Sequence, residues 1–141
     1  MLQTAFDTAV RTARTDIVRD HLNDAQHQAH PQPDTEASSS STSELPIDYL
    51  GITLQIAFYE LLYANSFSNG VIDAISYGGD TTNNAAITGA LLGARFGVDG
   101  IPDQWRTTVE HARLDRQKVF PDVCLADADA LVKRLLYKLS L

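Results

Sequence analysis

A glycine turn that leads through a polar run into a helix of small residues constrains the fold more than any other stretch of this chain. It extends from Tyr77 to Gly97 and reads YGGDTTNNAAITGALLGARFG. Glycine takes a positive φ at no steric cost, so Gly78 and Gly79 favour the end of one helix and a sharp reversal into the next. The stretch therefore predicts two helices joined by a tight turn.

The polar run after the glycines allows two uses of the same oxygen atoms. It consists of Asp80, Thr81, Thr82, Asn83 and Asn84. Each of these side chains can accept a hydrogen bond from a free amide in the first turn of a helix. The same oxygens are hard ligands of the kind that magnesium, manganese and calcium ions bind. Helix capping and cation binding are therefore competing interpretations of this run.

Small residues recur every four positions in the second helix of this stretch. They are Gly89, Gly93 and Gly97, with Ala86, Ala90 and Ala94 beside them. An interior glycine costs a helix about 1 kcal/mol relative to alanine, and close approach of another helix can offset that cost. Ile87, Leu91 and Leu92 fill the other faces. We therefore expect a central, buried helix whose apolar part is too short to span a membrane.

The composition narrows the class of protein. The chain has 141 residues, of which 44% are hydrophobic, and a net charge of -7. These values suit one globular domain, and the acidic excess disfavours binding to nucleic-acid phosphates. Cys124 is the single cysteine, which excludes a disulfide framework and a cysteine-based zinc site. Residues 1–7 lack the basic region and apolar run of a signal peptide, so we expect a cytoplasmic location.

Apolar residues at spacings of three and four predict one amphipathic helix within residues 1–30, part of the same domain as the rest. They are Leu2, Phe6, Ala9, Val10, Ala13, Ile17 and Leu22. A polar end follows, in which His21, His27 and His30 could hold a transition metal. We favour a fraying polar helix end, because the apolar stripe has run out where these histidines begin.

A segment rich in serine and proline separates this helix from the rest of the chain. Residues 31–47 hold too little apolar surface to repay the entropy of ordering, so they are expected to form a flexible insertion. Residues 48–141 are expected to form the helical core. The core opens with a helix over 48–65 that is apolar nearly all round and therefore buried. Glu60 in that helix is either a functional acid or, as we favour, the partner of an arginine at the rim.

Further helices are expected along the core. They are a short helix over 67–77 that Ser66 caps, a helix that Pro102 begins, and a last helix that Asp122 or Asp127 caps. Asp127 and Asp129 form a pair that could bind a cation, but as residues near a helix start they need no ligand. Five or six helices and no convincing strand predict an all-α domain.

The central stretch resembles the C-terminal signature of the ADP-ribosylglycohydrolase family. That family includes the dinitrogenase-reductase-activating glycohydrolases and the J-type crystallins. The matching elements are Gly78-Gly79-Asp80-Thr81, Asn84-Ala85-Ala86, Gly89-Ala90-Leu91-Leu92-Gly93-Ala94, Phe96-Gly97 and Ile101-Pro102-Asp103-Gln104-Trp105. The resemblance covers about residues 49–106, and so long an ordered string is far more specific than a lone glycine motif.

The resemblance implies an orthogonal multi-helix bundle like the C-terminal half of the family fold. It also implies magnesium-dependent hydrolysis, with manganese as a substitute, of the N- or O-glycosidic bond that joins ADP-ribose to a modified acceptor. In that comparison Asp80 matches a metal ligand, and Gly78, Gly79 and Thr81 match positions near the substrate. Thr82 stands where a second aspartate is expected and Asn83 where a threonine is expected, which removes a negative charge beside the metal.

The resemblance also implies that this chain is truncated. Family domains are much longer, and the acidic segments of their N-terminal half have no counterpart in this sequence. Two-metal catalysis needs several carboxylates, so Asp80 alone cannot supply the site. A second chain could provide the missing half around ADP-ribose or an ADP-ribosylated acceptor. The alternatives are a non-catalytic helical module without a metal that retains the family packing, and a homodimer formed through the small-residue stripe.

Overall fold

The computed structural model describes residues 2–30, 48–112 and 128–139, and these residues are helical or lie in turns. Within them no strand occurs, so the predicted all-α class is confirmed. The chain divides into two compact units, Met1–Gly100 and Ile101–Leu141. The expected division into 1–30, 31–47 and 48–141 stays a prediction. The insertion over 31–47 and the caps expected at Asp122 and Asp127 lie outside the described residues.

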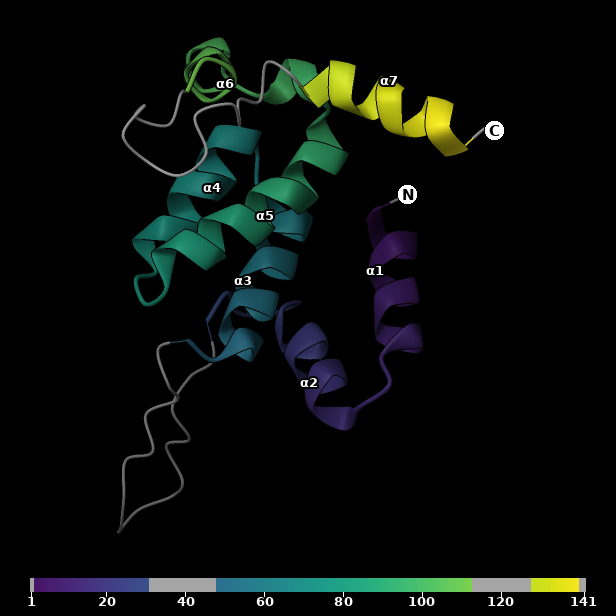
Figure 1. Ribbon diagram of the computed structural model, residues 1–141. Helices are drawn as coiled ribbons and strands as arrows, with labels where there is room; N and C mark the ends of the chain where they lie inside the picture. Colours follow the sequence, from purple (N-terminus) through teal and green to yellow (C-terminus); the bar gives the residue numbers. More distant parts are fainter. Residues whose placement is uncertain (1, 31–47, 113–127, 140–141) are drawn as a thin grey trace, which may run out of the picture. The chain divides into compact units, whose positions relative to one another are not determined.

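The first unit is built around one central helix. Its helices are α1 (Leu2–Thr12), α2 (Asp16–Asp24), α3 (Leu50–Tyr63), α4 (Phe67–Ser76), α5 (Thr81–Phe96) and the short 3-10 helix η1 (Val98–Gly100). Helix α3 packs against α1, α2, α4 and α5, while α4 and α5 pack against each other (Figure 1). Helix α3 therefore joins the N-terminal helices to the pair that carries the glycine turn.

The N-terminal region forms two helices, so the expected single amphipathic helix is wrong. Helix α1 ends at Thr12, and α2 begins at Asp16. Thr15 is the N-cap of α2 and its side chain accepts a hydrogen bond from the backbone amide of Val18. The break turns both short helices toward α3, where Phe6 packs edge-to-face on Phe58 with ring centres 6.0 Å apart.

The polar end expected after this helix is also wrong in part. The apolar face of α2 continues past Leu22 to Ala25, and both residues are buried. His21 lies among them and is half-buried against α3. The break between α1 and α2 shifts the phase of the apolar stripe, so the spacing of apolar residues along one continuous helix does not show that α2 is apolar as far as Ala25.

Helices α3 and α4 form as the sequence predicts. Ser66 is the N-cap of α4, and its hydroxyl accepts a hydrogen bond from the backbone amide of Asn69. A core cluster joins Ile52 and Ile56 of α3 to Ala74 of α4. Burial nearly all round α3 agrees with its nearly continuous apolar sequence.

Helix α5 does not bury its small residues, so that expectation is wrong. Its buried positions are Asn84, Thr88 and Leu92, one helical turn apart. Ala86, Ala90 and Ala94 are exposed, and Ile87 is 41% exposed. Gly89 and Gly93 are half-buried beside Phe67 of α4, at distances where a methyl group would make ordinary contact. The face of α5 toward α3 is therefore partly polar.

The second unit contains α6 (Asp103–Glu110) and α7 (Ala128–Leu139). Pro102 is the N-cap of α6, one position before the predicted start. Asp129 lies in the first turn of α7, and its proposed partner Asp127 lies outside the described residues. Across the described parts of the chain, no helix is both long enough and apolar enough to cross a membrane.

Candidate functional site

The glycine turn between α4 and α5 forms as a sharp reversal. Tyr77 is the C-cap of α4, and its backbone amide donates to the carbonyl of Asp73. Gly78 and Gly79 then take φ values of 78° and 69°. Any residue with a Cβ atom would be strained at these positions. Both glycines are thus required by the backbone of the turn, whatever else they do.

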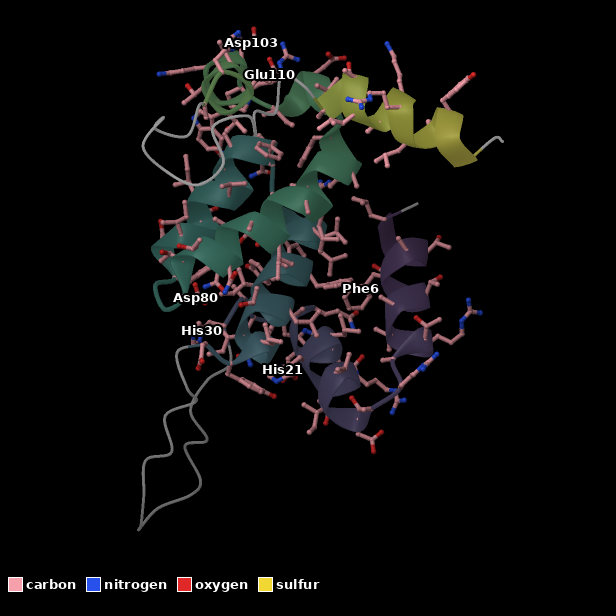
Figure 2. All side chains as sticks on the ribbon, in the orientation of Figure 1. Phe6, His21, His30, Asp80, Asp103 and Glu110 are labelled. Carbon is pink, nitrogen blue, oxygen red and sulfur yellow. The ribbon has the colours of Figure 1, made fainter. Side chains whose placement is uncertain are left out.

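Asp80 stands at the start of α5, directly after this turn (Figure 2). Its Oδ1 atom accepts a hydrogen bond from the backbone amide of Asn83 at 3.2 Å. Its Oδ2 atom accepts one from the side-chain amide of Asn83 at 2.6 Å. Asp80 is therefore the N-cap of α5, and each of its carboxylate oxygens has a partner on the same residue.

Asn84 fastens the turn to α3. It is 1% exposed, and its Nδ2 atom donates to the carbonyl of Gly78 at 3.1 Å. Its Oδ1 atom accepts a hydrogen bond from the hydroxyl of Thr53 on α3 at 2.7 Å. The sequence offered Asn84 as a candidate cap or cation ligand; its position one turn before Thr88 and two turns before the apolar Leu92 was the signal that it shares their face of the helix.

The other predicted site residues lie in the first turn of α5. Thr81 is half-buried, whereas Thr82 and Asn83 are exposed. The structure brings Asn83 onto Asp80 through two hydrogen bonds, but no hydrogen bond joins Thr82 to either residue. Capping, one of the two uses expected for this polar run, is the use that the structure shows.

The described residues do not fit a complete two-metal site. Within the described parts of the chain, no group of three or more histidine, cysteine, aspartate or glutamate side chains is arranged to hold a metal ion. The carboxylate of Asp80 is engaged with Asn83, whose amide nitrogen points at that carboxylate. Divalent cations need several oxygen ligands, so the residues near this turn can supply only part of such a site.

Among the described residues, the histidines do not belong to any cluster that could hold a metal ion. Nδ1 of His21 lies 3.0 Å from Oε1 of Gln55, and Nε2 lies 3.0 Å from the hydroxyl of Tyr49. Gly51 lies against this imidazole, where a methyl group would come within 2.3 Å of Nε2. His21 therefore joins α2 to the start of α3 as a half-buried hydrogen-bonding residue.

Glu60 is buried in α3, and its partner is a tyrosine. The residue is 2% exposed, and its Oε1 atom accepts a hydrogen bond from the hydroxyl of Tyr77 at 3.2 Å. No ion pair to Glu60 occurs among the residues that the structure describes, so the expected arginine partner is wrong. Burial, which outweighs the hydrogen bond, raises the pKa of Glu60 from 4.5 to about 7.

An unpaired hydroxyl is buried on helix α5, one turn beyond Asn84. Thr88 is 0% exposed, and its Oγ1 atom has no hydrogen-bond partner. It lies one turn beyond Asn84 on the face of α5 that meets α3. A lone buried hydroxyl is rare in proteins and leaves a desolvation cost uncompensated. Thr53, Asn84 and Thr88 therefore place buried polar groups at the contact between α3 and α5.

An apolar groove opens at the junction of α2, α3 and α5. It has a volume of about 360 Å³ and is lined by Ile17, Val18, His21, Tyr49, Leu50, Gly51, Leu54 and Ile87. Leu50 is 68% exposed at its edge. A second, more open hollow of about 550 Å³ lies between α1, α2 and α3, at Leu2, Gln3, Gln26, Leu62 and Tyr63.

The structure is therefore an all-α protein in which Asp80 stands at the start of α5. The buried Asn84 ties the glycine turn before that helix to α3. A model of the ADP-ribosylglycohydrolase family matches residues 1–138. The chain belongs to the ADP-ribosylglycohydrolase family. No solved structure matches this chain.

Curated relatives carry related names. An ADP-ribosyl glycohydrolase of Acanthamoeba polyphaga mimivirus is 29% identical over 86 residues, which cover 61% of this chain and 26% of that protein. The ADP-ribosyl-dinitrogen reductase glycohydrolase of Rhodospirillum rubrum is 31% identical over 62 residues, covering 44% of this chain and 21% of that protein. An ADP-ribosylarginine hydrolase of Pseudomonas putida is 32% identical over 92 residues, which cover 61% of this chain and 25% of that protein. The matched parts thus span about a quarter of each relative.

Proposed function

We propose that this chain is the motif-bearing part of an ADP-ribosylglycohydrolase, which cleaves the glycosidic bond between ADP-ribose and a modified acceptor. Family membership over residues 1–138 carries the proposal. The geometry supports it, because the turn at Gly78 and Gly79 holds Asp80 at the open start of α5.

The acceptor belongs to the same proposal. One relative is named for ADP-ribosylated dinitrogen reductase and another for ADP-ribosylarginine. We take an ADP-ribosylated protein side chain as the substrate class. The reaction breaks the bond between the ribose and the acceptor atom; the hydroxyl group of a water molecule bonds to the ribose carbon, and the remaining proton of that water goes to the acceptor atom.

The metal belongs to the proposal as well. Mg²⁺, with Mn²⁺ as a substitute, would use Asp80 together with acidic ligands that the described residues do not provide. Thr82 and Asn83 would add only neutral oxygens. Because the matched parts span about a quarter of each relative, further ligands would come from other residues or from a second chain.

Isothermal titration of ADP-ribose into the full chain, with and without magnesium chloride, tests the proposal. We expect magnesium-dependent binding that Asp80→Ala weakens at least roughly tenfold, the lower end of what losing a supporting residue costs a metal site. Asp99→Ala is the matched control, since Asp99 is exposed on η1. Binding that Asp80→Ala leaves unchanged would contradict the proposal, as would binding that is absent both from this chain alone and from a form completed with the missing acidic ligands.

A second candidate function rests on the hydrogen bonds of Asp80. Both of its carboxylate oxygens are already bonded to Asn83, as a purely structural cap would have them. In that case the chain is a non-catalytic helical module. Asp80→Ala would then lower the free energy of unfolding by about 1 kcal/mol and change no ligand affinity, because there would be none.

A further inference from the structure

Asn84 binds the backbone at both ends of the short segment that leads into α5. Its side-chain nitrogen donates to the carbonyl of Gly78 at 3.1 Å, and its backbone amide donates to the carbonyl of Asp80 at 2.9 Å. Gly79 lies between these two carbonyls with a φ of 69°. One residue of α5 therefore holds the chain on either side of Gly79.

The side chain of Asn84 can hold Gly78 in only one orientation of its amide. An asparagine amide carries an acceptor oxygen and a donor nitrogen, which exchange places when the amide rotates by half a turn. The carbonyl of Gly78 accepts hydrogen bonds and donates none, so it needs Nδ2 and would repel Oδ1. The oxygen Oδ1 must then face the other way, toward α3, and find a donor there.

The hydroxyl of Thr53 on α3 is that donor. It donates to Oδ1 of Asn84 at 2.7 Å, and both side chains are buried, at 4% and 1% exposure. Without this hydroxyl, Oδ1 would lose its donor in the interior and its desolvation would be uncompensated. The amide orientation that holds the turn therefore depends on a residue 31 positions away in the sequence.

We propose that Thr53 is a positioning residue for the glycine turn and that it acts through the amide of Asn84. Its hydroxyl keeps the amide nitrogen on the carbonyl of Gly78, and Asn84 in turn holds the backbone that leads to Asp80. Thr53 is neither a ligand nor a catalytic residue in this role. Its importance for binding ADP-ribose rests on the proposed function, whereas its effect on the turn does not.

A second buried threonine at the same helix contact provides a matched control. Thr88 is 0% exposed on the face of α5 that also carries Asn84, but its hydroxyl has no hydrogen-bond partner. Thr53→Val and Thr88→Val each replace a buried hydroxyl by a methyl group. Only the first removes a hydrogen bond to Asn84, so a difference between the two variants reports that bond.

Hydrogen exchange of the full chain, measured by amide NMR without metal or ligand, tests the proposal. The amides of Thr81 and Asn84 donate to carbonyls of the turn, so they report its local opening. In Thr53→Val they should exchange roughly two- to tenfold faster, as expected when one hydrogen bond is lost. In Thr88→Val their rates should match the natural chain. The amide of Gly97, at the far end of α5, should not change in either variant.

Thr53→Ser separates positioning from general stability. It keeps the hydroxyl but removes a buried methyl group, so it should lower the free energy of unfolding and leave exchange in the turn unchanged. A merely stabilising residue would instead make both substitutions accelerate exchange throughout the chain. In an Asn84→Ala background, Thr53→Val should have no further effect on the turn, because the amide through which it acts is gone.

The proposal is overturned if Thr53→Val leaves the turn amides at their natural rates, if Thr88→Val accelerates them equally, or if Thr53→Ser behaves like Thr53→Val. These readouts need no ADP-ribose. If exchange in the turn responds as expected but the binding experiment fails, the proposed function alone is contradicted.

Titration of ADP-ribose with magnesium measures the consequence for the site. Thr53→Val should weaken binding at least roughly tenfold, the lower end for a residue that supports a metal ligand, and Thr53→Ser should not. Binding that Thr53→Val leaves unchanged would contradict the importance of Thr53 for the site, even where the turn itself responds.

Discussion

At the scale of single residues, the glycines of this chain have different reasons for being glycine. Gly78 and Gly79 are needed for their positive φ values. Gly51 is needed because His21 and Tyr49 lie against it. Gly89 has no such need, since its neighbours would accept a methyl group at ordinary contact distance. A glycine in the sequence therefore does not show by itself how strongly its position requires glycine.

Gly51→Ala should therefore destabilise the protein although alanine is the better helix former. The new methyl group would lie 2.3 Å from Nε2 of His21 and 2.4 Å from Cε1 of Tyr49. Overpacking of this kind costs about 1–3 kcal/mol, more than the helix-propensity gain of about 1 kcal/mol. Urea unfolding monitored by circular dichroism measures the difference.

Gly89→Ala is the matched control for that substitution. It carries the same propensity gain on α5 without the clash, so the free energy of unfolding should rise by up to about 1 kcal/mol. Equal effects of the two substitutions would show that the close approach at Gly51 has no energetic weight.

At the scale of elements, the break between α1 and α2 determines how the N-terminal region meets α3. The apolar spacing alone predicts one helix, because it continues through Ala13 to Ile17. The structure ends α1 at Thr12 and caps α2 with Thr15. A local hydrogen bond thus overrides a pattern that extends over several turns.

Thr15→Ala distinguishes these two arrangements. With Thr15 as an N-cap, its loss should lower the free energy of unfolding by about 1 kcal/mol. With one continuous helix, alanine would raise it instead. Thr12→Ala is the control, because the hydroxyl of Thr12 donates only to carbonyls of its own helix. Thermal unfolding of the three proteins side by side gives the sign.

At the scale of the whole molecule, the buried carboxyl of Glu60 makes folding depend on pH. In the unfolded chain this group loses its proton near pH 4.5, whereas in the folded protein it keeps the proton up to about pH 7. Between these values the folded state binds more protons, so the contribution of Glu60 to the free energy of unfolding falls as the pH rises. Below pH 4.5 and above about pH 7 that contribution is constant.

Glu60→Gln should remove this dependence. At pH 8 the variant should be more stable than the natural chain by up to about 3 kcal/mol, and at pH 4 the two should agree closely. Asp99→Asn removes an exposed carboxyl and should not change the slope. Chemical unfolding at a series of pH values measures how the free energy of unfolding changes with pH. Parallel curves for the Glu60 variant and the natural chain would contradict a buried, neutral acid at Glu60.

Much of the fold could be predicted from local sequence signals. Ser66 marks the start of α4, the polar run from Asp80 to Asn84 marks the start of α5, and the nearly all-apolar pattern of α3 indicates burial. These signals work because caps, turns and apolar periodicity act within one or two helical turns. The family could be predicted as well, since its signature is a long ordered string around Gly78 and Asp80.

The contacts between helices that are distant in sequence depend on the tertiary structure. The sequence alone specifies the glycine turn, a helix cap somewhere from Asp80 to Asn84, and the helical class, because each depends on neighbouring residues. The sequence did not show that Tyr77 satisfies Glu60, that Asn84 joins the turn to Thr53, or that Ala86, Ala90 and Ala94 remain exposed. Those outcomes depend on which faces of α3, α4 and α5 meet, and burial against a partner helix is a property of the packed molecule rather than of any one segment.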